Sequence, residues 1–336
     1  MSVPSGMLAE ADLERLVAAG EVDTVILAFC DMQGRLTGKR VSARLFVEEV
    51  AAHGAECCNY LLAVDVDMNT VAGYAMSSWE TGYGDMVMTP DFSTLRLLPW
   101  LPGTAMVMAD LSFTDGRPVG VAPRSILTRQ IDRLAERDLV PYAGTELEFM
   151  VFRRRLPRGL GQGLSRADRG DGLQHRLRDA GVHEDGTAAA RHPAGHDRCR
   201  DVLRRRQGGE CNLGQQEIAF RYDHALVTCD NHTIYKNGAK EIADQHGKSL
   251  TFMAKFDERE GNSCHIHISL RGSDGSAVFA DDDDPQGMSP MFRSFVAGQL
   301  ATMRELTLFY APNINSYKRF AEGSFAPTAI AWGLDN

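Results

Sequence analysis

The sequence predicts an α+β protein with a small N-terminal domain, residues 1–110, and a larger second domain, residues 111–336. A length of 336 residues suggests about two domains. Segments with the two-residue period of strands are mixed along the chain with segments of helical period, and no internal repeat is present. Such a mixture is typical of an α+β architecture.

The N-terminal part is expected to begin with a short helix and a hairpin. Apolar residues at helical spacing between positions 8 and 17 predict the helix, which Gly20 would end. Thr24–Cys30 and Arg35–Ser42 have the composition of two strands joined around the turn Asp31-Met-Gln-Gly34.

The two prolines at Pro99 and Pro102 indicate a domain boundary. Beyond it the periods predict further elements in this order: a buried strand Ala105–Leu111, a helix from Pro123 with an apolar stripe reaching Ala135, a strand Val140–Phe152, a helix Ala225–His246 ended by Gly247, and a helix Met291–Phe309.

Two of the predicted strands carry charged or polar residues at alternate positions, which share one face of a strand. Glu146 and Glu148 would point together from the first strand. On the second, the residues that share a face are His265, His267 and Ser269, and we expect the other face to pack into a core through Ile266, Ile268 and Leu270.

A third motif, Glu210-Cys-Asn-Leu-Gly-Gln-Gln-Glu217, adds two more carboxylates. Lining one cavity with carboxylates and imidazoles is costly unless a cation binds there. Several carboxylates favour magnesium or manganese over zinc. Taken singly, the same residues could be a solvated strand face or hydrogen-bonded core histidines, but together they indicate a metal-dependent enzyme site.

Composition excludes several other classes. The net charge of −9 argues against non-specific nucleic-acid binding. No apolar stretch is long enough to span a membrane, and the first residues lack a hydrophobic signal core. Seven cysteines without a CxxC pair indicate reduced thiols, so we expect a cytoplasmic protein.

Residues 153–209 differ sharply from the rest of the chain. They include 14 arginines and 10 glycines, with no aromatic residue, isoleucine, methionine, lysine or asparagine. This composition favours a GC-rich gene translated out of frame. A disordered arginine-rich loop is one alternative, and an RNA- or phosphate-binding insert is another, although no aromatic side chain is interleaved for base stacking.

The three motifs, in this order, resemble those of glutamine synthetase and the related ATP-dependent glutamate–amine ligases. The resemblance covers residues 20–336 except 153–209. Asp31 to Lys39 resembles the N-terminal β-grasp hairpin of that family, and Asn315-Ser-Tyr-Lys-Arg319 and Ala331-Trp-Gly333 resemble its late active-site segment. The resemblance implies a β-grasp domain followed by a catalytic domain built on an antiparallel half-barrel with flanking helices.

The resemblance also implies a role for each site residue. Glu148, Glu210 and Glu217 would hold one Mg²⁺ or Mn²⁺ near glutamate, and Glu146 and His265 would hold a second on the ATP phosphates. The nucleotide would contact His267, Ser269 and Tyr222, and the substrates would contact Gly261 and Arg319, with Arg319 as the catalytic residue. Family members form homo-oligomeric rings, in which residues around Trp79 to Asp85 would complete a neighbour's site.

Two departures concern the nitrogen donor and the substrate loop. Phe325, in Gly323-Ser-Phe-Ala-Pro327, takes the place of a glutamate that accepts a proton from ammonium in glutamine synthetases. The family's Asn-Gly-Ser-Gly-Met is here Glu260-Gly-Asn-Ser-Cys264, so only Gly261 matches. We therefore expect glutamate to be joined to a small amine, such as ethanolamine or a polyamine, rather than to ammonia.

A third departure concerns completeness. The sequence stops at Asn336, inside a motif that continues in the family into arginines and a last glutamate, so weak or absent turnover is expected. An inactive remnant of the family is accordingly one alternative function. A cupin-like oxygenase, which also uses a His-x-His strand, is another, disfavoured by four glutamates and no clear third histidine.

Overall fold

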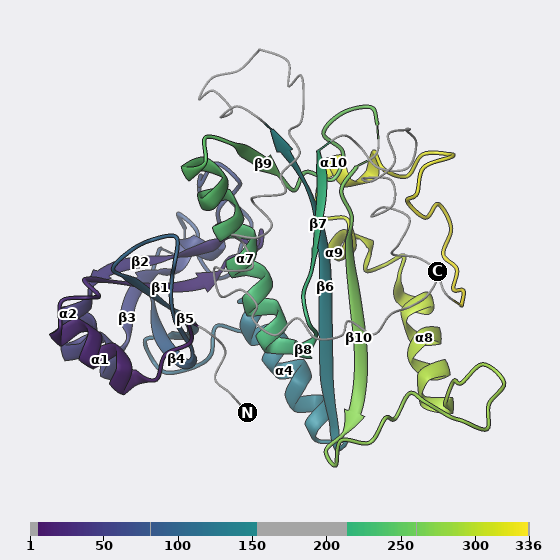
Figure 1. The fold of residues 1–336 in the computed structure, drawn as a ribbon, viewed down its shortest axis with the longest axis horizontal. Coiled ribbons are helices and arrows are strands. Elements are labelled where there is room, and N and C mark those ends of the chain that lie inside the picture. Colours follow the sequence, from purple (N-terminus) through teal and green to yellow (C-terminus); the bar gives the residue numbers. More distant parts are fainter. Residues whose placement is uncertain (1–5, 81, 153–213, 260, 335–336) are drawn as a thin grey trace. The chain divides into compact units, whose positions relative to one another are not determined.

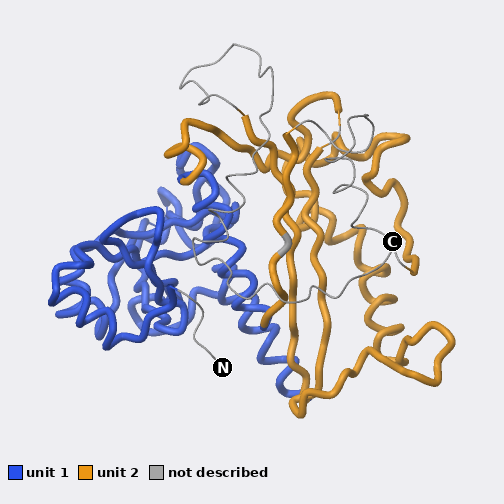
Figure 2. The backbone as a smooth tube through the Cα atoms, viewed as in Figure 1, with its two compact units in different colours: residues 1–137, 175–185, 224–241 blue, residues 138–174, 186–223, 242–336 orange. Residues whose placement is uncertain are grey.

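The computed structural model describes residues 6–80, 82–152, 214–259 and 261–334. The arginine-rich segment 153–209 therefore lies outside the described residues. The chain divides into two compact units, coloured separately in Figure 2. Among the described residues, unit 1 comprises 6–137 and 224–241, and unit 2 comprises 138–152, 214–223 and 242–334.

Unit 1 contains a five-stranded mixed sheet in the order β2-β1-β5-β4-β3 (Figure 1). β1 pairs with β2 as the predicted antiparallel hairpin and with β5 in parallel, so the buried strand predicted at 105–111 is confirmed. The strands are β1 (Thr24–Cys30), β2 (Leu36–Ser42), β3 (Ala55–Cys58), β4 (Asp85–Leu97) and β5 (Thr104–Phe113).

Helices complete the core of unit 1. The predicted N-terminal helix is α1, followed by Gly20 at φ +73°, and the helix predicted from Pro123 is α4. Leu13 of α1 and Phe46 pack with Leu27 and Val107 of the sheet, and all four are buried. The helices are α1 (Glu10–Ala18), α2 (Ala43–Leu45), η1 (Phe46–Val50), α3 (Ala51–His53), η2 (Asn59–Leu62), α4 (Pro123–Ala135) and α7 (Ala225–Gln245), the last belonging to unit 1 as far as Glu241.

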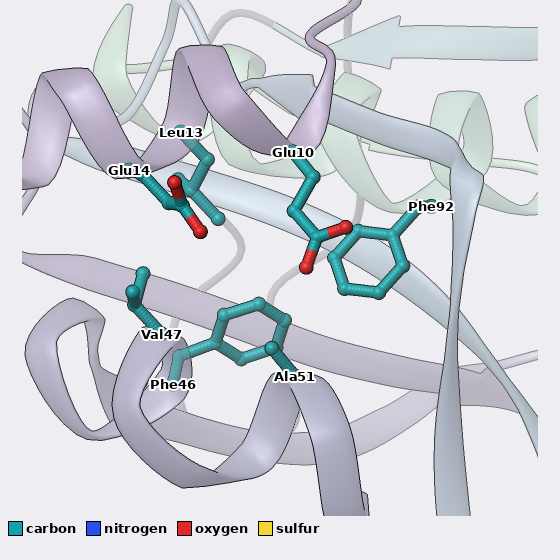
Figure 3. Close-up of a pocket in the computed structure, with 7 residues that line it drawn as sticks. All are labelled: Glu10, Leu13, Glu14, Phe46, Val47, Ala51 and Phe92. Atoms are coloured by element: carbon teal, nitrogen blue, oxygen red, sulfur yellow. The ribbon is translucent and has the colours of Figure 1, made fainter.

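A small hollow lies against this core, shown in Figure 3. Glu10 and Glu14 of α1 line one side of it, and Phe46 lies across from them. Phe92 lies beside Glu10, and its ring meets that of Phe46 edge to face with 6.3 Å between the ring centroids. The hollow contains none of the sequence-predicted site residues. It is a shallow gap in the packing between α1 and the segment 46–51.

Arg124 joins the helices of unit 1 to its sheet. It is the only buried residue of α4, and its Nη2 lies 3.1 Å from Oδ2 of Asp230 on α7. The guanidinium also bonds to Asp91 of β4 and Asp110 of β5. A buried arginine requires such partners, and three carboxylates from different elements hold α4 and α7 on the sheet.

Unit 2 is built on a second sheet, in which two long strands, β6 and β10, run antiparallel side by side (Figure 1). β7 pairs with the other edge of β6, giving the order β10-β6-β7, and β9 also pairs with β6. The strand predicted at 140–152 is thereby confirmed. The strands are β6 (Leu139–Phe152), β7 (Gln215–Ala219), β8 (Asp223–His224), β9 (Ser249–Thr251) and β10 (Cys264–Gly272).

The helices of unit 2 correct one prediction. The single helix expected over Met291–Phe309 is wrong, because turns at residues 303–306 divide it. The hydroxyls of Thr302 and Thr307 each bond to the carbonyl four residues earlier, Gly298 and Met303, which bends helices. The helices are α8 (Pro290–Thr302), α9 (Thr307–Tyr310) and α10 (Ile314–Tyr317).

A second correction concerns β10. Ile266 and Ile268 were expected in the core, but they are 57% and 46% exposed, and only Leu270 is buried. The alternation in the sequence predicts which residues share a face of the strand. It does not predict whether other parts of the protein cover that face.

Membrane and redox expectations can be compared with the described part of the chain. None of its helices is both long and apolar enough to cross a membrane. The five cysteines it contains are free thiols, at positions 30, 57, 58, 229 and 264.

Candidate active site

The centre of the site is the face of β6 that carries Glu146 and Glu148. Leu147 and Phe149 are buried on the opposite face, as the alternation predicted. The antiparallel register places His265 of β10 opposite Glu146, and Glu217 of β7 opposite Glu148. Three strands therefore bring Glu146, Glu148, Glu217 and His265 together.

Glu146 contacts both histidines of β10. Its Oε2 lies 3.3 Å from Nδ1 of His265 and 3.3 Å from Nε2 of His267. The Glu146 carboxylate is 14% exposed, whereas both imidazoles are 59% exposed. The hydrogen bonds to this carboxylate raise the pKa of His265 and of His267 above the ordinary value, because they favour the protonated imidazole.

Glu148 and Glu217 add negative charge to the same cluster. Both carboxylates contribute to raising the pKa of His265, and Glu217 does so for His267. Like charges directly opposite each other on neighbouring strands are destabilising. The cluster is therefore rich in negative charge at its β7 side and has imidazoles at its β10 side.

A polar loop follows β9 and leads into β10. Ser263, at its end, donates two hydrogen bonds to Oε2 of Glu148, from the backbone N–H at 2.5 Å and from Oγ at 2.7 Å. Gln215 of β7 donates to the carbonyl of Gly261 at 2.9 Å. The loop is thus attached to the carboxylate face at two points.

The same loop lies beside Arg319. A β-carbon on Gly261 would lie 1.9 Å from the carbonyl oxygen of Ala254 and 3.2 Å from Cδ of Arg319. Only glycine allows this close approach. The side chain of Asn315 accepts from the N–H of Lys255 and donates to its carbonyl, both at 2.7 Å. Gly261 and Arg319, both predicted substrate residues, are therefore adjacent.

Aromatic and basic side chains from β6, β10 and the segment before β8 meet at the far end of β10. Ser269 pairs in register with Tyr142 of β6, whose ring centroid lies 6.1 Å from that of Tyr222. Arg271 donates from Nη2 to the hydroxyl of Tyr222 at 3.1 Å, and its guanidinium carbon lies 5.0 Å from the centroid of the Tyr142 ring. The predicted nucleotide residues Ser269 and Tyr222 thus lie at one end of the cluster.

Sequence reasoning missed several residues of this arrangement. Arg271 continues the alternation His265, His267, Ser269, so the spacing could have identified it. Ser263, Asn315 and Gln215 lie inside motifs that the sequence analysis singled out, but no pattern predicted their hydrogen bonds, because the partners lie far away in the sequence.

One predicted ligand, Glu210, lies outside the described residues. Among the residues that are described, no three histidine, cysteine, aspartate or glutamate side chains already form a group that could hold a metal ion. The described part of the cluster is a row of carboxylates and imidazoles rather than a closed coordination shell.

The chain matches known proteins along most of its length. The family model for the glutamine synthetase catalytic domain matches residues 120–336. The γ-glutamylethanolamide synthetase GlnA4 of Streptomyces coelicolor is 56% identical, over 97% of this chain and 70% of that protein. A glutamate–isopropylamine ligase from Pseudomonas is 34% identical, over 94% of this chain and 69% of that protein.

Solved structures agree with these sequence matches. GmaS without ligand superposes with a TM-score of 0.68 at 27% identity, covering 92% of this chain and 68% of that one. The chain belongs to the glutamine synthetase family of carbon–nitrogen ligases.

Proposed function

We propose that this protein is an ATP-dependent glutamate–amine ligase. The γ-carboxylate of glutamate would attack the γ-phosphorus of ATP, giving γ-glutamyl phosphate and ADP. A small amine would then displace phosphate, lose a proton and leave a γ-glutamyl amide. The observation that carries this proposal is the row of Glu217, Glu148, Glu146 and His265 across three strands of a glutamine synthetase-type domain.

The residues present fit divalent cations. Glu148 and Glu217 face each other on neighbouring strands and carry the same charge. A cation between them would offset their mutual repulsion. We assign one Mg²⁺ or Mn²⁺ to Glu148, Glu210 and Glu217, and a second to Glu146 and His265. Carboxylate oxygens suit these metals. When bound, they would neutralise charge on the phosphates during transfer.

The family resemblance supports a role for each of the remaining residues. Arg319 would contact the transferred phosphoryl group or the substrate carboxylate, and Gly261 would allow glutamate to approach the loop closely. His267, Ser269 and Tyr222 would contact ATP. A site closed around these groups would protect the acyl phosphate from water.

The nitrogen donor is proposed to be a small amine rather than ammonia. Phe325 is 65% exposed and has no proton-accepting group, so it would pack against the carbon skeleton of an amine. Two relatives with substantial identity are named as a γ-glutamylethanolamide synthetase and a glutamate–isopropylamine ligase. We further propose a ring-shaped oligomer, a β-grasp fold for the N-terminal part and a domain division at residue 110.

The test is an assay of the full chain with ATP, glutamate, Mg²⁺ or Mn²⁺ and a panel of amines that includes ammonia and ethanolamine. ADP release and the mass of the γ-glutamyl product are measured together. We expect an alkylamine to be used better than ammonia. Preference for ammonia would contradict the donor assignment. Binding of Mn²⁺ and ADP without any turnover would instead favour the inactive relative that the sequence also allows.

A variant tests the role of Phe325 directly. Phe325→Glu restores a carboxylate, and we expect the ratio of kcat/KM for ammonia to that for the best amine to rise about tenfold. Phe309→Glu is the matched control, at another exposed phenylalanine of unit 2. Equal ratios in the two variants would exclude Phe325 from the amine site.

A further inference from the structure

Ser263 and Glu148 form a reciprocal pair. The N–H of Glu148 donates to the carbonyl of Ser263 at 3.0 Å. In return, the N–H and the hydroxyl of Ser263 both donate to the same oxygen, Oε2 of Glu148, at 2.5 and 2.7 Å. One oxygen of the carboxylate is thus occupied by two hydrogen bonds from a single residue.

Ser263 is itself held firmly on its N-terminal side. Its neighbour Asn262 is 4% exposed and donates from Nδ2 to the carbonyl of Met253 at 2.9 Å and to that of Thr251 at 3.3 Å. The N–H of Asn262 donates to Ala254. Ser263 is followed at once by β10, so its hydroxyl is positioned before any ligand binds.

We propose that Ser263 is a positioning residue of the metal site, a role that rests on the proposed function of Glu148 as a ligand. By engaging Oε2 with two hydrogen bonds, it fixes the rotamer of Glu148 and leaves the lone pairs of Oε1 for a divalent cation. A flexible glutamate loses side-chain freedom when it binds a metal. A glutamate whose rotamer is already fixed has lost this freedom during folding, so metal binding does not bear that entropic cost.

The hydroxyl is a feature of this chain rather than of the general motif. Aligned on Gly261, the family motif Asn-Gly-Ser-Gly-Met places glycine at the position of Ser263. Glycine would keep the backbone N–H bond to Glu148 but could not supply the bond from Oγ. Groups that hold metal ligands by hydrogen bonds typically change metal affinity by about 10- to 100-fold when removed.

The test uses the full chain and Mn²⁺ as the probe, with binding measured by calorimetry in the absence of substrates. Glu148→Gln identifies the binding event that involves Glu148. For that event we expect Ser263→Ala and Ser263→Gly to weaken affinity about 10- to 100-fold. Ser263→Thr, which keeps the hydroxyl, should bind like the wild type. Ser273→Ala, at an exposed serine just beyond β10, is the matched control.

The melting temperature of each metal-free variant separates positioning from folding. We expect it to be the same for the wild type, Ser263→Ala and Ser263→Thr. Wild-type affinity in Ser263→Ala, or equal weakening in Ser263→Thr and Ser263→Ala, would overturn the inference while leaving the metal site intact. Absence of any Mn²⁺ binding by the wild type would instead overturn the metal site, and the inference with it.

Discussion

Glu148 on β6 and Glu217 on β7 are direct cross-strand partners in an antiparallel sheet. Such a pair of like charges opposes folding of the metal-free protein. A cation that binds both would reverse the sign of this contribution. Metal binding and the stability of unit 2 are therefore expected to be linked.

The first prediction concerns this linkage. Ligand binding to the folded state alone stabilises it by about 2.7 kcal/mol at a hundred times the dissociation constant. We expect saturating Mn²⁺ to raise the melting temperature of the wild type by about 5 °C or more. Glu217→Gln should show a much smaller shift, measured by differential scanning calorimetry. The control Glu136→Gln, at an exposed position after α4, should respond like the wild type. An undiminished shift in Glu217→Gln would remove Glu217 from the metal site.

The shared face of Glu146, Glu148, His265 and His267 could be predicted from the sequence because alternation is a local rule, and β6 and β10 are regular strands. The pairing of Glu148 with Glu217 could not, because register depends on which strands become neighbours. The exposure of Ile266 was missed for a related reason: no local pattern states what covers a face.

Loop residues were the least predictable. Asn315 resembled part of an active-site motif, but its sequence gave no sign that its amide would bond to Lys255, 60 residues away. The same holds for the bonds from Ser263 to Glu148, which are 115 residues apart. Long-range hydrogen bonds of this kind follow from the fold, and neither composition nor periodicity predicts them.

The second prediction follows from the bonds of Asn315. Asn315→Ala removes both hydrogen bonds to Lys255, so the segment that leads to Arg319 is no longer fixed to the loop between β9 and β10. We expect kcat/KM for glutamate to fall about 10- to 100-fold, because small displacements of positioning groups are costly. Steady-state kinetics at varied glutamate concentration measure this fall in kcat/KM.

Asn313→Ala is the control for Asn315→Ala. Asn313 is exposed at the start of α10 and makes no capping bond with its side chain. Equal kinetic constants for wild type and Asn315→Ala would show that the two bonds do not position Arg319.

The third prediction concerns Gly261. A β-carbon there would collide with the carbonyl of Ala254, so Gly261→Ala must displace the loop and with it the neighbourhood of Arg319. We expect at least a tenfold loss of kcat/KM for glutamate, on the order expected for misplaced contacts. Gly298→Ala in α8, where a β-carbon meets nothing within 4 Å, should keep activity and raise stability by about 0.5–1 kcal/mol. Similar activity in the two variants would contradict a role for Gly261 in the site.

The fourth prediction concerns His232, on α7 of unit 1. Burial, with a further contribution from the positive charge of Lys236, lowers the pKa of His232 to about 4 from an ordinary value of 6.5. The unfolded chain therefore binds a proton below pH 6.5 that the folded chain does not bind until about pH 4. This proton uptake favours the unfolded state, so the folded state loses stability as the pH falls from 6.5 towards 4, and the loss is absent above pH 6.5.

His232→Gln should remove this dependence, which amounts to at most about 3 kcal/mol. The free energy of unfolding in urea is to be measured at pH 7.5 and at pH 5, and the loss on acidification compared between proteins. We expect a smaller loss in His232→Gln than in the wild type. The control His246→Gln, at an exposed position after α7, should lose as much as the wild type. Because the wild type and His232→Gln share every other titratable group, the difference between them isolates His232. Equal losses in these two proteins would show that the His232 imidazole is solvated enough to be protonated in the folded state.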